Sequence, residues 1–126
     1  KSIQMCKDLG VQSELFLIRN FGYGCHDHYQ EYDTIYHSWD VVKDILESKI
    51  TEGIVVDVGC PVLHKAALYN ARVIMHNNKI IGIRPKMILA DGDNYFETRQ
   101  FASWDSKRSV GTFKLPQAVQ NITGQT

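Results

Sequence analysis

The sequence predicts an α/β fold, because short β-branched runs alternate along the chain with stretches of helical period. The clearest strand is Gly53–Gly59, in which isoleucine and valines are bracketed by glycines. The clearest helix starts at Ser38, where apolar residues recur at helical spacing. With 126 residues, the chain has room for one domain at most, so we expect residues 1–126 to form part of a single domain.

The N-terminal half is expected to contain two helices and a strand. Lys1–Leu9 has its apolar residues near one helical face, and Gly10 is a natural stop behind it. Leu15–Ile18 is an apolar run short enough for a buried strand. In the next helix, Ser38 serves as the N-terminal cap and Glu47 as the last residue. The residues of that helix expected to face the core are Trp39, Val42, Ile45 and Leu46.

The C-terminal half is predicted to contain a β-hairpin. Tyr69–Met75 and Lys79–Arg84 are the two strands, and the polar turn His76–Lys79 joins them. Thr112–Leu115 is expected to be a last short strand. Gln117–Thr126 is expected to be a polar tail or the start of a helix.

The charge balance argues against two classes of partner. Lys+Arg and Asp+Glu both number 14, and the isoelectric point is near 7.1. The chain therefore lacks the basic excess that is typical of nucleic-acid and membrane-surface binding. No apolar run approaches the roughly 20 residues of a membrane-spanning helix. We expect neither nucleic acid nor a membrane as a partner.

The cysteines and the first residue bear on the cellular context. Cys6, Cys25 and Cys60 are an odd, widely spaced set, which is typical of reduced thiols rather than of a disulfide framework. The sequence starts at Lys1, without an initiator Met or an apolar signal segment. We therefore expect a cytoplasmic location and a piece of a longer protein, truncated at both ends.

A lysine at the end of a strand is the first candidate for chemistry. Pro85 has no backbone N–H and a fixed φ, so it should end the strand and present Lys86 at its terminal edge. A lysine there, beside an Asp/Gly/Asn loop and a Tyr and a Glu, is suited to stabilise an anion or an oxyanion. The residues alone leave open the alternative of a lysine that simply faces water.

The window from Arg84 to Trp104 carries the pattern R-P-K-M-x-L-A-x-x-x-N-Y-x-E-x-R-x-F-x-x-W. It resembles the signature at the catalytic lysine of glutamine-dependent NAD+ synthetases, in their N-terminal nitrilase-type glutaminase (carbon–nitrogen hydrolase) domain. The loop 90–94 departs mildly from that signature. Further segments that resemble the same family are 22–29, 37–39, 57–65, 69–70 and 123–125.

The resemblance implies part of a nitrilase-like αββα sandwich and a glutaminase chemistry. In the family a Glu–Lys–Cys triad releases ammonia from glutamine: the cysteine attacks the amide, the glutamate relays the proton and the lysine stabilises the oxyanion. Lys86 matches the lysine, and Glu97 matches a second carboxylate near the site. Asn94 and Tyr95 are assigned to substrate binding. For Glu97, a surface carboxylate paired with Arg99 or with water is the alternative.

Two members of that triad are missing at the positions that the resemblance gives them. Leu17 stands where the family has its catalytic glutamate. Glu14 is three residues away, which is roughly 10 Å along a strand and on its opposite face, so we do not expect it to substitute. The family's nucleophile falls after Thr126, and we expect none of the three cysteines to replace it. Residues 11–21 reflect either real divergence or a local frameshift or mis-spliced exon.

No metal or cofactor is expected in this domain. Cys25, His26, Asp27 and His28 have side chains that bind metals, but their spacing matches no zinc pattern, and a hydrogen-bonded loop cluster is expected instead. The resemblance implies ATP only in the absent synthetase domain, which amidates nicotinic acid adenine dinucleotide. The implied partners are glutamine, that synthetase domain and further copies in a homo-oligomer.

Three interpretations compete. The chain is a segment of an active glutamine-dependent synthetase, a catalytically dead nitrilase-like module that acts by binding or oligomerisation, or an unrelated α/β module. Lys86, Tyr95 and Glu97 favour the first two over the third. Leu17 favours the second over the first for this polypeptide, so we expect no glutaminase activity from the chain alone.

Overall fold

The computed structural model describes residues 13–19, 32–89, 91–92, 95–96, 101–104 and 110–126. The elements in this part of the chain are β1 (Ser13–Arg19), α2 (Tyr32–Glu47), β2 (Val55–His64), β3 (Ala67–His76), β4 (Lys79–Pro85), β5 (Asp91–Gly92), β6 (Tyr95–Phe96) and α3 (Gln117–Thr123). Neither of the two described helices has the length and apolar character needed to cross a bilayer.

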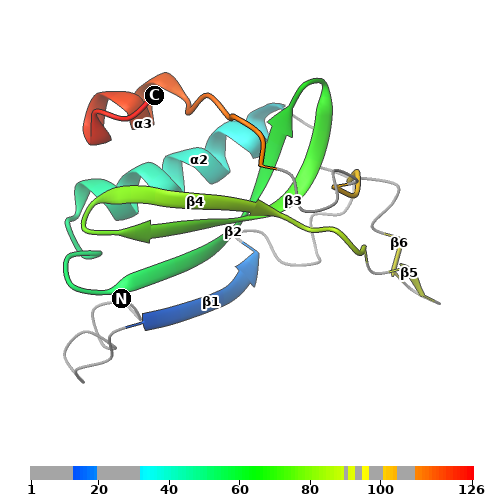
Figure 1. Cartoon of the computed structure of the whole chain (residues 1–126), viewed down its shortest axis with the longest axis horizontal. Coiled ribbons are helices and arrows are strands. Elements are labelled where there is room, and N and C mark those ends of the chain that lie inside the picture. Colours follow the sequence, from blue (N-terminus) through cyan, green and yellow to red (C-terminus); the bar gives the residue numbers. More distant parts are fainter. Residues whose placement is uncertain (1–12, 20–31, 90, 93–94, 97–100, 105–109) are drawn as a thin grey trace.

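Four of the described strands form one sheet in the order β1-β2-β3-β4. β1 runs parallel to β2, whereas β3 is antiparallel to both of its neighbours, β2 and β4. β5 and β6 form a separate two-stranded sheet. Figure 1 shows α2 and α3 together on one side of the larger sheet. Helices therefore cover one face of a mixed sheet, and the predicted α/β class is confirmed.

Helix α2 begins at Tyr32, earlier than predicted. Ser38 is buried inside the helix, so its assignment as the cap is wrong. Ile35 lies four positions before Trp39 and extends the apolar stripe by one turn, and no glycine or proline interrupts the chain between Tyr32 and Ser38. The predicted core positions are confirmed, since three are buried and the fourth packs against the core: Trp39, Val42, Leu46 and Ile45.

Strand β2 continues well past its predicted end at Gly59, because Pro61 does not interrupt it. Pro61 lies opposite Asn70 of β3. The carbonyl oxygen of Asn70 accepts a hydrogen bond from Lys86 and so points away from β2. The missing N–H of Pro61 would accordingly face the β1 side, where the described pairing ends at Gly59. A proline is tolerated at such an unpaired strand edge.

Two tight turns connect the antiparallel strands. Asn77 and Asn78 link β3 to β4 with φ of 48° and 63°, and the hairpin predicted from this polar turn is confirmed. Lys65 and Ala66 link β2 to β3 with φ of 48° and 63°, although neither residue type favours a turn. Positive φ at both central residues is typical of type I′ turns, whose twist matches that of the flanking strands.

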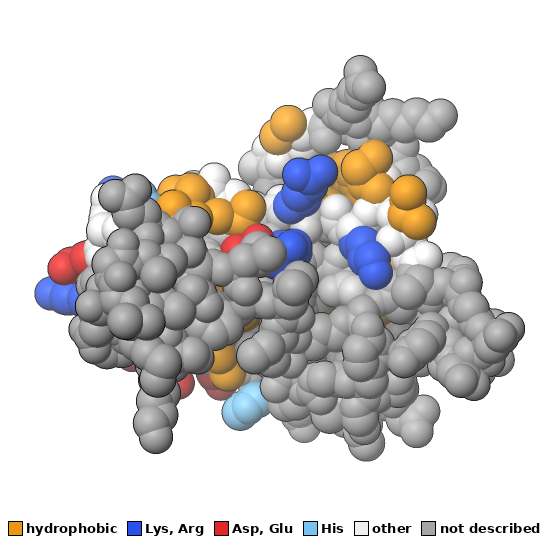
Figure 2. All heavy atoms as spheres, turned by 90° about the horizontal axis from the view of Figure 1, so that it is seen from below, with side chains coloured by type: hydrophobic (Ala, Val, Ile, Leu, Met, Phe, Trp, Pro, Cys, Tyr) orange, Lys and Arg blue, Asp and Glu red, His pale blue; other side chains and the backbone are white. Residues whose placement is uncertain are grey.

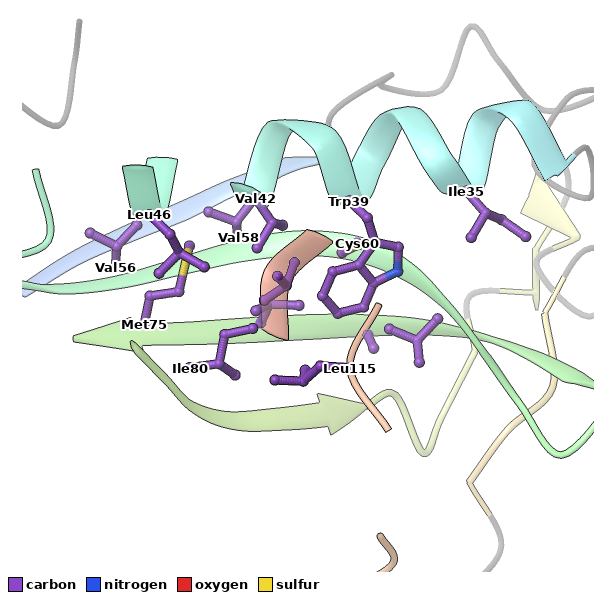
Figure 3. Packing of buried hydrophobic residues seen from close by; sticks show 14 of the residues in the cluster. Ile35, Trp39, Val42, Leu46, Val56, Val58, Cys60, Met75, Ile80 and Leu115 are labelled. Carbon is purple, nitrogen blue, oxygen red and sulfur yellow. The ribbon is translucent and has the colours of Figure 1, made fainter. Parts of the chain in front are cut away.

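The core lies between the two helices and the sheet face that they cover. Alternate residues of β2 are buried on that face, as a strand period of two requires. Figure 3 shows the apolar residues of α2 pointing toward those of β2 and β3. Each fully buried aliphatic side chain contributes about 1.5–3 kcal/mol. The buried residues from the sheet and from the C-terminal segment include Val56, Val58, Cys60, Val62, Val73, Met75, Ile80, Leu115 and Val119.

The other face of the sheet has no helix over it in the described ranges. Asp57 and Arg72 lie on it and form an ion pair, with 2.9 Å between Oδ1 and Nε. Figure 2 views the molecule from the side away from α2 and α3, and it shows hydrophobic and basic side chains next to one another there. A sheet covered by helices on one face only is half of a layered sandwich.

Residues 112–115 form no strand, so that prediction is wrong. Leu115 is buried and donates its N–H to the carbonyl oxygen of Thr126 rather than to a strand. The outer edge of β4 is already occupied there, because the side-chain amide of Gln125 bonds to the backbone N–H and C=O of Ile80. Helix α3 follows, and it confirms the helix start predicted for this region.

Candidate functional site around Lys86

Lys86 follows β4 directly, as the proline before it predicts. The strand ends at Pro85, which pairs with Ala71 of β3. Lys86 is half-buried. Lys86 therefore lies at the end of β4 in a partly enclosed position.

The backbone of Lys86 is held from two sides. Its N–H donates to the carbonyl oxygen of Asn70 at 2.8 Å, and its own carbonyl oxygen accepts from the N–H of Trp104 at 3.2 Å. The two partners belong to different segments, since Asn70 lies in β3 and Trp104 follows β6 in the chain. Two hydrogen bonds of normal length, one from its N–H and one to its C=O, restrict where the side chain of Lys86 begins.

The segment 101–104 pairs with the edge of β3 beyond the point where the pairing of β4 with β3 ends. Ala102 forms a parallel bridge with Tyr69 and donates its N–H to the carbonyl oxygen of Leu68 at 2.7 Å. The ring of Trp104 meets that of Tyr69 edge to face, with 5.5 Å between centroids. Sequence reasoning missed this pairing because the segment F-A-S-W has no β-branched residue and its partner is distant in sequence.

A pocket of about 250 Å³ lies beside this junction, on the helix-covered face of the sheet. Pro85 and Met87 line it, together with Trp104, but Lys86 between them does not. Successive residues of an extended chain point to opposite faces, which explains why the neighbours of Lys86 line the pocket without it. The pocket and the lysine are therefore separate features of one strand end.

Comparison with known proteins shows the fold and the proteins that the chain resembles. No family model matches the chain. The glutamine-dependent NAD(+) synthetase of Homo sapiens is 44% identical over 126 residues, which cover 99% of this chain and 18% of the human protein. Over almost its whole length, this chain matches a segment of a glutamine-dependent NAD(+) synthetase. It spans about a fifth of the length of the curated relatives that it matches.

Two solved structures support the same fold. A glutamine-dependent NAD(+) synthetase from Cytophaga hutchinsonii has a TM-score of 0.77 at 24% identity, covering 88% of this chain and 19% of its own. A carbon–nitrogen hydrolase from Helicobacter pylori G27 has a TM-score of 0.62 at 17% identity, covering 82% of this chain and 37% of its own. The fold is thus the nitrilase-like one of carbon–nitrogen hydrolases. One sheet with its helix layer is the part of the αββα sandwich seen here.

Leu17, at the position that the family resemblance gives to the catalytic glutamate, lies in β1. The backbone of β1 pairs in register with β2 from Ser13 to Phe16, and the register then shifts before Arg19 pairs with Gly59. Leu17 falls within this irregular part. Glu14 pairs opposite Val56 in the regular part, so the shift lies between the two positions. Strict alternation along β1 therefore does not place the side chains of Glu14 and Leu17 on opposite faces of the sheet.

The remaining predicted site residues are described only in part. Tyr95 lies in β6, where its backbone pairs with Gly92 of β5. Asn94 and Glu97 lie outside the described residues, as does residue 90 of the same loop. The predicted substrate-binding and carboxylate roles of these residues stay predictions.

Of the three cysteines, only Cys60 lies in the described part of the chain. It is buried in β2, and burial raises the pKa of its thiol to about 12. A thiol that stays protonated at neutral pH is a poor nucleophile. Cys25, His26, Asp27 and His28 lie outside the described residues, and the described ranges hold no cluster of metal-binding side chains.

Proposed function

We propose that this chain is a segment of a glutaminase domain, which in glutamine-dependent NAD+ synthetases hydrolyses glutamine to supply ammonia for amidation of nicotinic acid adenine dinucleotide. Identity to the human synthetase along 99% of the chain supports this function. The observation that carries it is the placement of Lys86 between Asn70 and Trp104. A lysine held in this way is preorganised to stabilise the oxyanion that forms when the glutamine amide is attacked.

We propose further that the chain does not turn over glutamine by itself. Leu17 has an aliphatic side chain, and it cannot accept the proton of a nucleophile or return it to departing ammonia. Cys60 is buried and protonated, so it cannot attack the amide. Within its described residues, the chain would therefore supply the oxyanion-stabilising group of the site but neither its general base nor its nucleophile.

The other parts of the proposal follow from the family resemblance. Glu97 would orient Lys86 and the ligand, and Asn94 and Tyr95 would bind glutamine. ATP would be used only by a synthetase domain outside this sequence, and the assembly would be a cytoplasmic homo-oligomer. The roles of Asn94, Tyr95 and Glu97 are supported by the match of the R-P-K-M to W pattern with the family signature.

A graft tests the assignment of Lys86 and Leu17 together. The human synthetase would carry this 126-residue sequence in place of its matching segment, and NAD+ formation would be measured with glutamine and, separately, with ammonia. We expect synthesis with ammonia but not with glutamine, because only the supply of ammonia is interrupted. A Leu17→Glu graft should regain glutamine-dependent synthesis, and adding Lys86→Ala should abolish it again.

The ammonia reaction is the control for folding of the graft. Glutamine-dependent synthesis by the graft with Leu17 in place would show that the base is not at this position. A Leu17→Glu graft that works with ammonia and stays inactive with glutamine would contradict the assignment of that position. Retention of the restored activity in the Lys86→Ala variant would refute the oxyanion role of the lysine.

One observation favours the second candidate, a catalytically dead module. An aliphatic residue at the position of the base, in the irregular part of β1, is what a domain retained for binding or oligomerisation would tolerate. This candidate predicts that the Leu17→Glu graft stays inactive with glutamine while its oligomeric state in sedimentation matches that of the unmodified human enzyme.

A further inference from the structure

Two arginines lie side by side on the face of the sheet that is turned away from α2 and α3. Arg72 of β3 has Arg84 of β4 as its backbone partner. Directly paired residues of neighbouring strands put their side chains on the same face, with Cβ atoms about 5 Å apart. On the β2 side, the partner of Arg72 is Gly59, which has no side chain. The pair therefore holds two like charges where they repel each other.

The carboxylate of Asp57 balances only part of this charge. Its Oδ1 accepts a hydrogen bond from Nε of Arg72 at 2.9 Å. Nη2 of Arg72 is buried and has no hydrogen-bond partner among the described residues. Arg84 is exposed and forms no ion pair within the described ranges. One positive charge is therefore left in excess, beside a buried donor that calls for an acceptor.

The fold makes this excess charge costly. In an αββα sandwich the face turned away from the helices packs against a second sheet, and the described helices of this chain lie on one side only (Figures 1 and 2). Such packing removes water from both guanidinium groups. A guanidinium taken out of water is stable only when it is paired and hydrogen-bonded. Asp57 serves Arg72 through Nε alone, so the second sheet must bring a further acceptor.

We propose that an Asp or Glu of the second sheet, outside these 126 residues, places its carboxylate between Arg72 and Arg84. One carboxylate oxygen accepts from Nη2 of Arg72 and the other from the guanidinium of Arg84, in charge-assisted hydrogen bonds. The sandwich alone requires only an apolar second sheet, whereas this pair requires an acidic residue at one position. The proposal does not depend on glutaminase activity, because a catalytically dead domain would need the same carboxylate.

Hydrogen–deuterium exchange at the backbone amides of β3 and β4 tests the charge of the partner. In the 126-residue chain alone, Arg84→Gln relieves the repulsion, so exchange at low salt should slow by about twofold. In the human synthetase that carries this sequence as a graft, the same change leaves a buried carboxylate short of a partner, and exchange should become at least about tenfold faster. Lys79→Gln, at the other end of β4 opposite His76, should change neither. Changes of the same direction in both proteins would refute the proposal.

Cross-linking of the same graft identifies the carboxylate. In Arg84→Lys, a carbodiimide activates the neighbouring carboxylate, and the introduced amine displaces it as a urea to form an amide without a spacer. We expect peptide mapping to find a new link from β4 to an Asp or Glu of the human sequence outside the graft, and to find no such link when Arg84 is in place. A new link only to Asp57 or to another residue of the graft, or no new link in a graft whose β3 and β4 amides are protected from exchange, would overturn the proposal.

Discussion

The side-chain amide of Gln125 pairs with both backbone polar groups of Ile80. Its Oε1 accepts from the N–H at 2.9 Å, and its Nε2 donates to the carbonyl oxygen at 2.8 Å. A neighbouring strand would satisfy the same two groups in the same way. Ile80 lies on the outer strand of the sheet. The Gln125 amide therefore satisfies backbone groups that could otherwise pair with a strand of another chain.

We predict that Gln125→Glu destabilises the fold. A carboxylate can still accept from the N–H of Ile80 but cannot donate to its carbonyl oxygen, and an unpaired half-buried group costs about 1–3 kcal/mol. Urea unfolding measures the difference. The control is Gln117→Glu in the first turn of α3, where a negative charge is favourable and the amide donates only an exposed hydrogen bond, to Asn121, whose loss water can compensate. Equal stabilities for the two variants would contradict the role of Gln125.

Replacing Ala66 by glycine should stabilise the β2–β3 turn. Ala66 has a φ of 63°, a left-handed conformation that costs a residue with a Cβ roughly 1–2 kcal/mol and costs glycine nothing. We expect a net gain of about 1 kcal/mol in the free energy of unfolding, reduced by the greater freedom of glycine in the unfolded chain. Ala118→Gly, inside α3, should instead lose about 1 kcal/mol. A loss of stability in both variants would contradict the turn geometry.

Cys60 should make stability fall at alkaline pH. Its pKa is raised from 9.0 to about 12 by burial, so above pH 9 the unfolded thiol ionises while the folded one stays protonated. The contribution of Cys60 is fully present below pH 9 and is lost by up to about 1.4 kcal/mol per pH unit as pH rises toward 12. Unfolding measured at several pH values should show a shallower decline in Cys60→Ala, which retains all other titrating groups. Parallel declines would rule out the raised pKa.

Thr51 joins the loop after α2 to the β3–β4 hairpin. It is buried, and its hydroxyl oxygen accepts from the backbone N–H of Asn78 at 2.8 Å. Thr51→Val keeps the shape but leaves that N–H unpaired, so we expect a loss of about 1–3 kcal/mol. Thr51→Ser keeps the hydroxyl and should lose less. Thermal unfolding compares the two, and a more stable valine variant would show that the hydrogen bond contributes nothing.

The sequence predicted the elements whose signals are local. The β3–β4 hairpin follows from the polar residues around Asn77 and Asn78, which adopt the turn conformation readily. The face of α2 follows from the spacing of Trp39, Val42 and Leu46. The placement of Lys86 at a strand end follows from the fixed φ of Pro85. In each case the residue that decides the structure lies within the element itself.

The parts that were missed depend on partners elsewhere in the chain. The turn at Lys65 and Ala66 has no turn-forming residue, and it is set by the pairing of β2 with β3. The predicted strand ended at Gly59, but β2 continues through Pro61, whose missing N–H faces an unpaired edge because the carbonyl of Asn70 points away from β2. The bond from Trp104 to Lys86 joins segments that no local pattern connects. The pocket required this same long-range arrangement.

The order in which the chain is made has a consequence for Lys86. On a ribosome, β3 and β4 emerge before Trp104, and their two-residue turn lets them pair at once. The backbone N–H of Lys86 can then already bond to Asn70. Its second bond must wait until Trp104 has been synthesised and has settled beside Tyr69. Lys86 therefore reaches its final position late, and a nascent chain stalled before Trp104 would hold a finished hairpin in which Lys86 lacks its bond to Trp104.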